Sequence, residues 1–238
     1  VLGPAVGLYA LQAYGSSILY LFLTIMTGVA LVLSNTIRLP KELAKPKHKS
    51  MKGWHISQFI EKRSLPWALM GLFIGFTYSG VLVFIPIELN SIGAGVWGSV
   101  FFALFALMII ISRPLVGKIY ARYGSHFVIY PGIILFIIGL AILGIADTPV
   151  GIIGTAPLLG LGYGAAQPAF QALAVQSAPI ERAGVSTATY FLALDIAVGA
   201  GSIILAMIAN ALGYQYLYQI TALIMVVALG LYHFIIKG

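Results

Sequence analysis

The sequence predicts an all-α membrane protein, a polytopic bundle of helices, and three observations support this prediction. Of its 238 residues, 61% are hydrophobic and only 8% are charged, whereas soluble domains carry about 25% charged residues. Apolar runs of the length that a helix needs to cross a bilayer recur along the chain. The cations all fall on alternate connections between these runs. This composition excludes a soluble globular protein and a disordered one.

The apolar runs define the predicted helices. Only helices and closed barrels satisfy their backbone hydrogen bonds in lipid, and long runs without alternation predict helices instead of barrel strands. A short run at about 1–13 is followed by seven full-length runs, at about 16–37, 66–87, 94–116, 127–146, 150–175, 184–208 and 214–236. We therefore expect seven complete helices and part of an eighth.

The distribution of the 13 cations sets the orientation of these helices. Most lie in a polar stretch at 38–64; the others are Arg113, Lys118, Arg122, Arg182 and Lys237. Because cytoplasmic loops are enriched in Lys and Arg, these connections and the C-terminus are expected in the cytoplasm. The protein is expected to be an integral, multi-pass protein of a bacterial plasma membrane. The net charge of +7 then indicates topology and contact with anionic lipid, not nucleic acid.

The polar stretch divides the chain into three parts. Residues 1–37 carry two helices, 38–64 form a basic linker, and 65–238 form a six-helix bundle. Apolar and polar residues alternate over 53–63, which favours a short amphipathic helix on the membrane surface. Six helices after a long cytoplasmic loop are the outline of one transporter half.

Two sequence motifs resemble those of the major facilitator superfamily. Gly3-Pro4-Ala5-Val6-Gly7 resembles the antiporter signature, a Gly-Pro-x-x-Gly-Gly run in the fifth of twelve helices, with Leu8 at the last glycine. The segment 112–124 resembles the family's Gly-x-x-x-Asp-Arg-x-Gly loop. Its matching residues are Gly117, Arg122 and Gly124, and Ala121 stands at the aspartate position.

A third motif, Asp195 to Ser202, is similar to an Asp-x-x-x-Gly-x-Gly run in the eleventh helix of drug-efflux members. The resemblance covers essentially the whole chain. It implies that the eight segments are the fifth to twelfth helices of a twelve-helix carrier, whose first four helices would precede Val1.

The implied function is secondary active transport, namely proton-coupled efflux of a small amphipathic molecule by alternating access. The expected partners are the lipid bilayer, this substrate, protons and the preceding helices of the same chain; no cofactor, metal or enzymatic activity is expected. A proton-coupled symporter that imports a small nutrient is the alternative, since only the Gly-Pro run favours export. A seven-helix receptor is disfavoured because the outer connections are minimal, and an intramembrane protease because a catalytic dyad is missing.

Asp195 is the candidate for proton coupling. It lies eleven residues beyond Gly184, which places it roughly 16 Å deep, near the bilayer midplane. An ionised Asp there costs about 2.5–3.5 kcal/mol on insertion scales, so we expect it inside the protein. Coupling or contact with a cationic substrate is one interpretation, and a structural hydrogen bond between helices is the other.

The candidate cavity residues are polar side chains in the middle of two runs. Tyr163, Gln167 and Gln171 recur every four residues and so share one helix face, while Thr77 and Tyr78 lie midway along another helix. Phe101, Phe102, Phe105 and Met108 are expected to face lipid or to pack, and contact with the substrate is the less favoured interpretation.

The conformational-lock candidates are Arg113, Arg122 and Glu181. Arg122 is expected to pair with Glu181 across the cytoplasmic face. Arg113 either lies inside a helix that continues past Pro114, where it needs a partner, or anchors a helix end at the interface.

Small residues are the candidates for close helix packing. They are Gly3, Pro4, Gly7, Gly199 and Gly201. The first three are expected to contact the segment at about 98–106.

Overall fold

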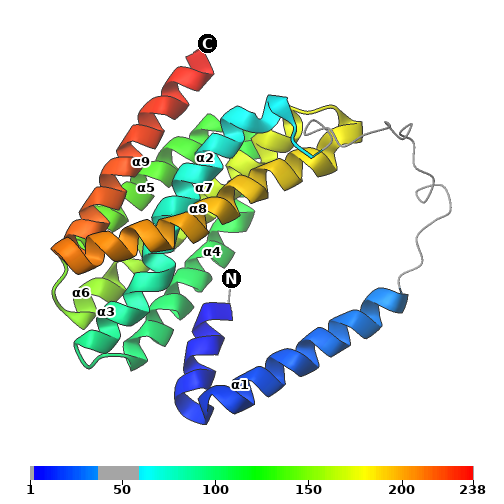
Figure 1. Ribbon diagram of the computed structural model, residues 1–238. Helices are drawn as coiled ribbons and strands as arrows, with labels where there is room; N and C mark the ends of the chain where they lie inside the picture. The colour runs from blue at the N-terminus through cyan, green and yellow to red at the C-terminus, as the bar shows by residue number, and fades with distance from the viewer. Residues whose placement is uncertain (1–2, 37–58, 238) are drawn as a thin grey trace.

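A computed structural model of the chain describes residues 3–36 and 59–237, which form helices and short connections (Figure 1). Within these ranges, seven helical stretches are long and apolar enough to cross a membrane: Ala13–Thr36, Lys62–Ser91, Val96–Tyr123, His126–Leu143, Pro149–Gln176, Ile180–Leu212 and Tyr214–Ile235. Each coincides with one of the seven predicted full-length runs, so the helical membrane fold is confirmed. The predicted surface helix at 53–63 lies largely outside the described residues.

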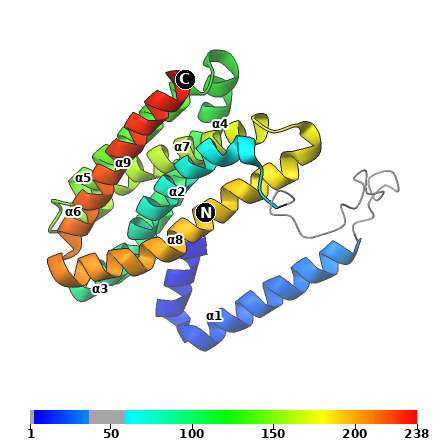
Figure 2. The same ribbon diagram turned by 45° about the horizontal axis from the view of Figure 1, so that its top comes forward.

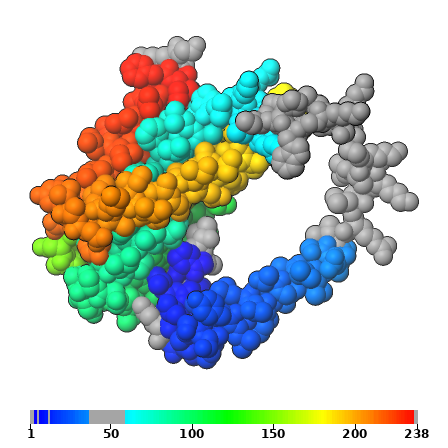
Figure 3. Space-filling model, in the orientation of Figure 1, coloured from blue at the N-terminus to red at the C-terminus, as the bar shows by residue number. Residues whose placement is uncertain are grey.

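The first helix, α1 (Gly3–Thr36), bends sharply at Gly15, which has φ 79° and ψ 172°. Residues with a side chain avoid this conformation, so the glycine makes the turn between the two runs that precede the linker. The limb before Gly15 packs on α4 (Val96–Tyr123), where Leu8 approaches Gly98. The limb after Gly15 stands away from the other helices with its apolar side chains exposed (Figure 3).

The six spans after the linker are formed by the remaining helices: α2 (Leu65–Ser79), α3 (Ile85–Ser91), α4, α5 (His126–Leu143), α6 (Pro149–Gly154), α7 (Ala156–Gln176), α8 (Ala183–Leu212) and α9 (Tyr214–Lys237). A π-helical turn at Gly80–Phe84 joins α2 to α3. Helix α4 continues through Pro114 and ends at Gly124, which has φ 92°. Arg113 therefore lies inside a helix, which settles the two alternatives for it.

These spans form one bundle with α7 near its centre (Figures 1 and 2). Helix α7 packs against α4, α5, α2 and α8, and α2 packs against α8 and α9. The bundle has a basic end, defined by the five cations Lys62, Arg63, Lys118, Arg122 and Arg182. Helices α2, α5 and α8 begin there, and α4, α7 and α9 end there.

Glycines on α7 make this central packing possible. A Cβ atom on Gly160 would lie 2.6 Å from the Phe105 carbonyl oxygen of α4, and one on Gly162 would lie 2.6 Å from the Phe136 nitrogen of α5. Neither neighbour is a flexible side chain that could move aside. Lipid supplies no hydrophobic drive for helices to associate, so such close backbone contacts hold membrane bundles together.

The glycines proposed from the motifs have different surroundings. Gly201 lies against α2, where an added Cβ would be 2.5 Å from the Ser79 hydroxyl oxygen. Added Cβ atoms on Gly3, Gly7 and Gly199 would meet nothing within 4 Å. Gly3 and Gly7 therefore do not make the contact between α1 and α4. The larger side chain of Leu8 makes it, against Gly98.

Hydrogen bonds and an ion pair join α2, α7 and α8 at the basic end. The Ser64 hydroxyl lies 3.0 Å from the Ala174 carbonyl oxygen and 2.7 Å from the Ser186 hydroxyl. The Arg182 guanidinium pairs with the Glu61 carboxylate, and no other ion pair occurs in the described ranges. The start of α2 is thus fixed to the junction between α7 and α8.

The first prediction concerns the contact between α7 and α5. Gly162→Ala places a methyl group against the α5 backbone, and we expect overpacking to lower the free energy of unfolding by about 1–3 kcal/mol. Thermal unfolding of the purified protein measures this. The control is Gly230→Ala on α9, where an added Cβ meets nothing within 4 Å; its melting temperature should stay level or rise, because Ala favours helix over Gly. Equal melting of both variants would contradict the account.

The second prediction concerns the Glu61–Arg182 pair. The hydrogen bond from Arg182 lowers the pKa of the Glu61 carboxyl below its ordinary value of 4.5. The stabilisation is therefore complete above the unfolded-state pKa and is lost as pH falls through the lowered one. We expect Glu61→Gln to melt below wild type at neutral pH, and this gap to close as the pH falls below 4.5 and through the lowered pKa of Glu61.

Thermal unfolding at a series of pH values measures the gap. The control is Glu181→Gln, because the Glu181 carboxylate forms no ion pair with any described residue. The control should show no pH-dependent gap. If the melting temperature of Glu61→Gln lies equally far below that of wild type in acid and at neutral pH, the ion pair is not the cause of the difference.

Candidate functional site

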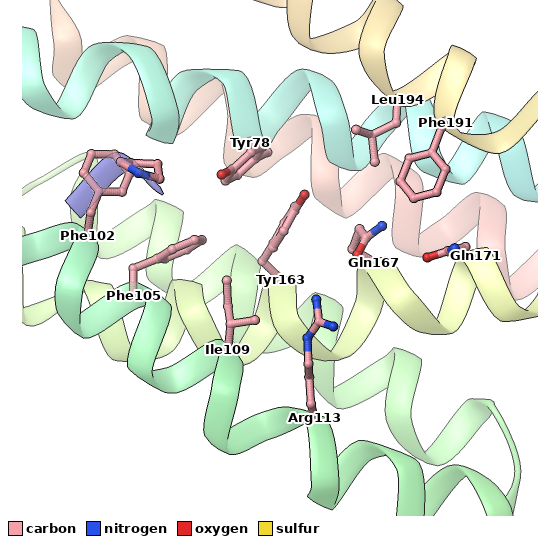
Figure 4. Close-up of a pocket in the computed structure, with 11 residues that line it drawn as sticks. Tyr78, Phe102, Phe105, Ile109, Arg113, Tyr163, Gln167, Gln171, Phe191 and Leu194 are labelled. Atoms are coloured by element: carbon pink, nitrogen blue, oxygen red, sulfur yellow. The ribbon is translucent and has the colours of Figure 1, made fainter. Parts of the chain in front are cut away.

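A pocket of about 440 Å³ lies in the bundle between α2, α4, α7, α8 and the first limb of α1 (Figure 4). Its lining consists of aromatic, aliphatic and long polar side chains: Pro4, Tyr78, Phe102, Phe105, Ile109, Arg113, Tyr163, Gln167, Gln171, Phe191 and Leu194. Its volume is in the range of sites for small organic molecules.

Four of the predicted cavity residues meet in this pocket. Tyr163, Gln167 and Gln171 line it from one face of α7, as their spacing predicts, and Tyr78 lines it from α2. The rings of Tyr78 and Tyr163 are stacked, with centroids 4.3 Å apart. The Tyr163 hydroxyl and the Gln171 amide have no hydrogen-bond partner in the described part of the chain, so both are available to a ligand.

Thr77 does not belong to the pocket, which corrects its assignment as a cavity residue. It is fully buried, and its hydroxyl donates to the carbonyl oxygens of Phe73 and Ile74 in its own helix at 3.1 Å. Successive residues of an α-helix point about 100° apart. With Tyr78 directed into the pocket, Thr77 is directed into the packed interior.

The aromatic wall of the pocket is formed by residues for which substrate contact was the less favoured interpretation of the sequence. Phe102 and Phe105 line it from α4, although packing or lipid contact was expected. The ring of Phe105 lies 6.1 Å from that of Tyr163, centroid to centroid. Together with Ile109 and Arg113, these residues recur at spacings of three, four and four. An apolar helix face that leads to an arginine is the sequence signal that could have identified the aromatic wall.

Arg113 is the one formally charged residue that lines the pocket. Its guanidinium points from α4 toward the α7 face that carries Tyr163 and Gln167 (Figure 4). It lies ten residues before the end of α4 at Tyr123, or about 15 Å along the helix axis, and it has no ion-pair partner among the described residues. An arginine at the bilayer centre costs about 2.5–3.5 kcal/mol on insertion scales, so this position favours water or a counter-charge beside it.

A second cavity, of about 280 Å³, shares Arg113 with the pocket. It lies between α4 and α7 on the side of the basic end, next to Pro168 and Tyr120. The Tyr120 hydroxyl donates to the Gln176 side-chain oxygen at 3.1 Å and links the two helices there. The two cavities together follow the α4–α7 seam from the pocket toward the basic end.

Asp195 is exposed on α8, so the described helices do not enclose it as expected. Its neighbour Leu194 lines the pocket, whereas Asp195 does not. The reason is its helix face, which also carries Leu192, three residues earlier, at 51% exposure. Its carboxylate and the Arg113 guanidinium both interact electrostatically with the Tyr163 hydroxyl, so Asp195 lies near the pocket without lining it.

A different acid is buried. Glu88, which falls between the predicted runs at 66–87 and 94–116, lies on α3 with only 8% of its surface exposed. Its carboxylate lies beside the hydroxyl of Tyr218, with which it interacts electrostatically. No three described His, Asp or Glu side chains are grouped to bind a metal ion.

The expected lock between Arg122 and Glu181 is not formed in this structure. The Arg122 guanidinium lies over the ring of Tyr123, 5.3 Å from its centroid. The residue after Glu181, Arg182, makes the ion pair instead, with Glu61. Sequence analysis missed this pair because Glu61 lies in the linker, far away along the chain.

The comparisons with known proteins agree with this architecture. The sequence model of the Major Facilitator Superfamily matches residues 1–202, a range that includes every residue lining the pocket. A search of curated proteins finds no match to the sequence. By its family match, its seven apolar helical spans and its fold, the chain belongs to the major facilitator superfamily of membrane transporters.

Proposed function

We propose that the chain is part of a secondary active transporter that exports a small amphipathic molecule in exchange for protons. The observation that carries this proposal is the pocket, which combines an aromatic wall with an arginine and two glutamines. An amphipathic molecule needs both kinds of surface. A site in the middle of a helical bundle is also where alternating-access carriers bind their substrates.

The fold supplies features that suit alternating access. The π-helical turn at Gly80–Phe84 begins two residues after Tyr78, and such turns are frequent at functional sites. At the other side of the pocket, the cavity that shares Arg113 extends toward the basic end. If the π-helical turn and the basic end of the bundle moved alternately, the pocket would open first to one side of the membrane and then to the other.

In this proposal the basic end and the C-terminus face the cytoplasm of a bacterial cell. Residues 1–37 end the first half of the carrier, 38–64 link the halves, and 65–238 form the second half. Further helices would complete the transporter. The exposed apolar surfaces of α8 and of the second limb of α1 would suit such helices.

Transport in proteoliposomes tests the proposal. The probes are three naphthalene derivatives with different head groups: naphthalenesulfonate, naphthylmethyltrimethylammonium and naphthylmethanol. The intact protein should drive at least one of them against an imposed pH gradient, and Tyr163→Ala should reduce this flux by about tenfold, as loss of a central aromatic contact does. Flux toward the acidic side supports export in exchange for protons, and flux with the protons indicates the symporter. Identical flux with and without the protein would contradict both.

A further prediction concerns the coupling acid. Asp195→Asn keeps the size and hydrogen bonding of the side chain but cannot carry a proton. We expect gradient-driven flux to fall about tenfold, a typical strength of coupling between two sites, while probe binding persists. The matched variant is Glu88→Gln, which removes the buried acid on α3 and should leave the flux intact. If Glu88→Gln abolishes coupling and Asp195→Asn does not, Glu88 is the coupling acid and the assignment of Asp195 is wrong.

A further inference from the structure

The charge of the pocket indicates the class of its ligand. We infer that the pocket binds an organic anion, whose acidic head group is held by Arg113 and whose apolar, ring-bearing body lies against the aromatic wall. This inference rests on the proposed transport function and names the substrate class for the same site. It follows from three features of the pocket: its single charge, the grouping of its long polar side chains at one side, and the position of the nearest acid.

The first feature is the single formal charge. Among the described residues that line the pocket, Arg113 is the only Lys, Arg, Asp or Glu, and its guanidinium is turned toward α7 (Figure 4). A guanidinium has donors in a planar fork that fits the paired oxygens of a carboxylate or a similar acid. With no ion-pair partner in the described residues, this fork is available to a ligand.

The second feature is the order of residues along the pocket. Arg113, Gln167 and Gln171 lie at one side, with Phe191 and Leu194 beside the glutamines, whereas Phe102 and Phe105 lie at the other side, where no polar side chain is labelled (Figure 4). Tyr78 and Tyr163 stand between them with stacked rings. A ligand with an acidic head and a flat apolar body can therefore place its head at the arginine and its body along the rings. Amide groups beside the head can donate further hydrogen bonds to it.

The third feature is the position of Asp195. A cationic substrate needs a carboxylate in the pocket, but Asp195 is not among the lining residues and does not approach Arg113 within ion-pair distance. The Asp195 carboxylate interacts electrostatically with the Tyr163 hydroxyl, which lies in the pocket. The fixed charge that a ligand meets is therefore that of Arg113.

Equilibrium binding of the three naphthalene probes to the intact purified protein tests the inference. Isothermal titration calorimetry should show naphthalenesulfonate binding at least about tenfold more tightly than the ammonium or the alcohol, as expected for a charge-assisted hydrogen bond. Arg113→Gln should abolish this preference, and Arg113→Lys should retain part of it, since lysine keeps the charge but loses the planar fork. The matched control is Lys118→Gln on the same helix, which removes an exposed cation outside both cavities and should leave the preference unchanged.

The outcomes separate this inference from the transport function. Preferential binding of the ammonium, equal binding of all three probes, or an anion preference that survives in Arg113→Gln would each overturn the inference. In these cases gradient-driven flux of the probe that does bind would still support the transporter. If none of the three probes binds to the wild-type protein, the inference is also overturned. Flux of an unrelated molecule through the same pocket would still leave the transport proposal standing.

Discussion

The close approach of α7 to both α4 and α5 is the contact on which the rest of this bundle depends. In lipid, helices gain little from burying apolar surface, so association relies on packing and polar contacts. Gly160 and Gly162 leave no room for a side chain between α7 and the backbones of its neighbours. Gly160 and Gly162 are two positions apart, so they lie on opposite sides of α7 and face α4 and α5, respectively. Helix α7 is therefore held between these two helices, and its rotation about its own axis is fixed.

This fixed rotation determines the site. With its glycines turned to α4 and α5, α7 presents Tyr163, Gln167 and Gln171 to the space bounded by α2 and α8. Helix α4 runs beside it and continues through Pro114, which carries Arg113 into the same space instead of to the membrane surface. The ion pair and serine hydrogen bonds at the basic end then hold α2 and α8 around the pocket. The polar and aromatic halves of the pocket are thus a consequence of helix packing.

Hydropathy and helical periodicity were sufficient to predict the spans and the polar face of α7, because each depends on residues close together in the sequence. They did not predict which way Arg113 points, because this depends on whether a helix continues through a proline. The buried position of Glu88 beside Tyr218 and the pairing of Glu61 with Arg182 join residues far apart in the chain. Such contacts follow from how helices rotate and tilt against one another, which a local pattern does not encode. The exposure of Asp195 has the same origin, since depth along a helix says nothing of which face carries the residue.

The central claim is that this pocket is the site that opens to each side of the membrane in turn. These 238 residues contain no cysteine, so a single introduced cysteine reports its own surroundings. The most direct measurement is the labelling of Gln167→Cys by a membrane-impermeant maleimide, applied from either side of oriented vesicles with the pH gradient imposed in either direction. The account predicts that the cysteine reacts from one side under one gradient and from the other side under the reverse gradient, whereas a cysteine at the exposed Leu223 position of α9 shows no such exchange. Labelling of Gln167→Cys from the same side under both gradients would contradict it.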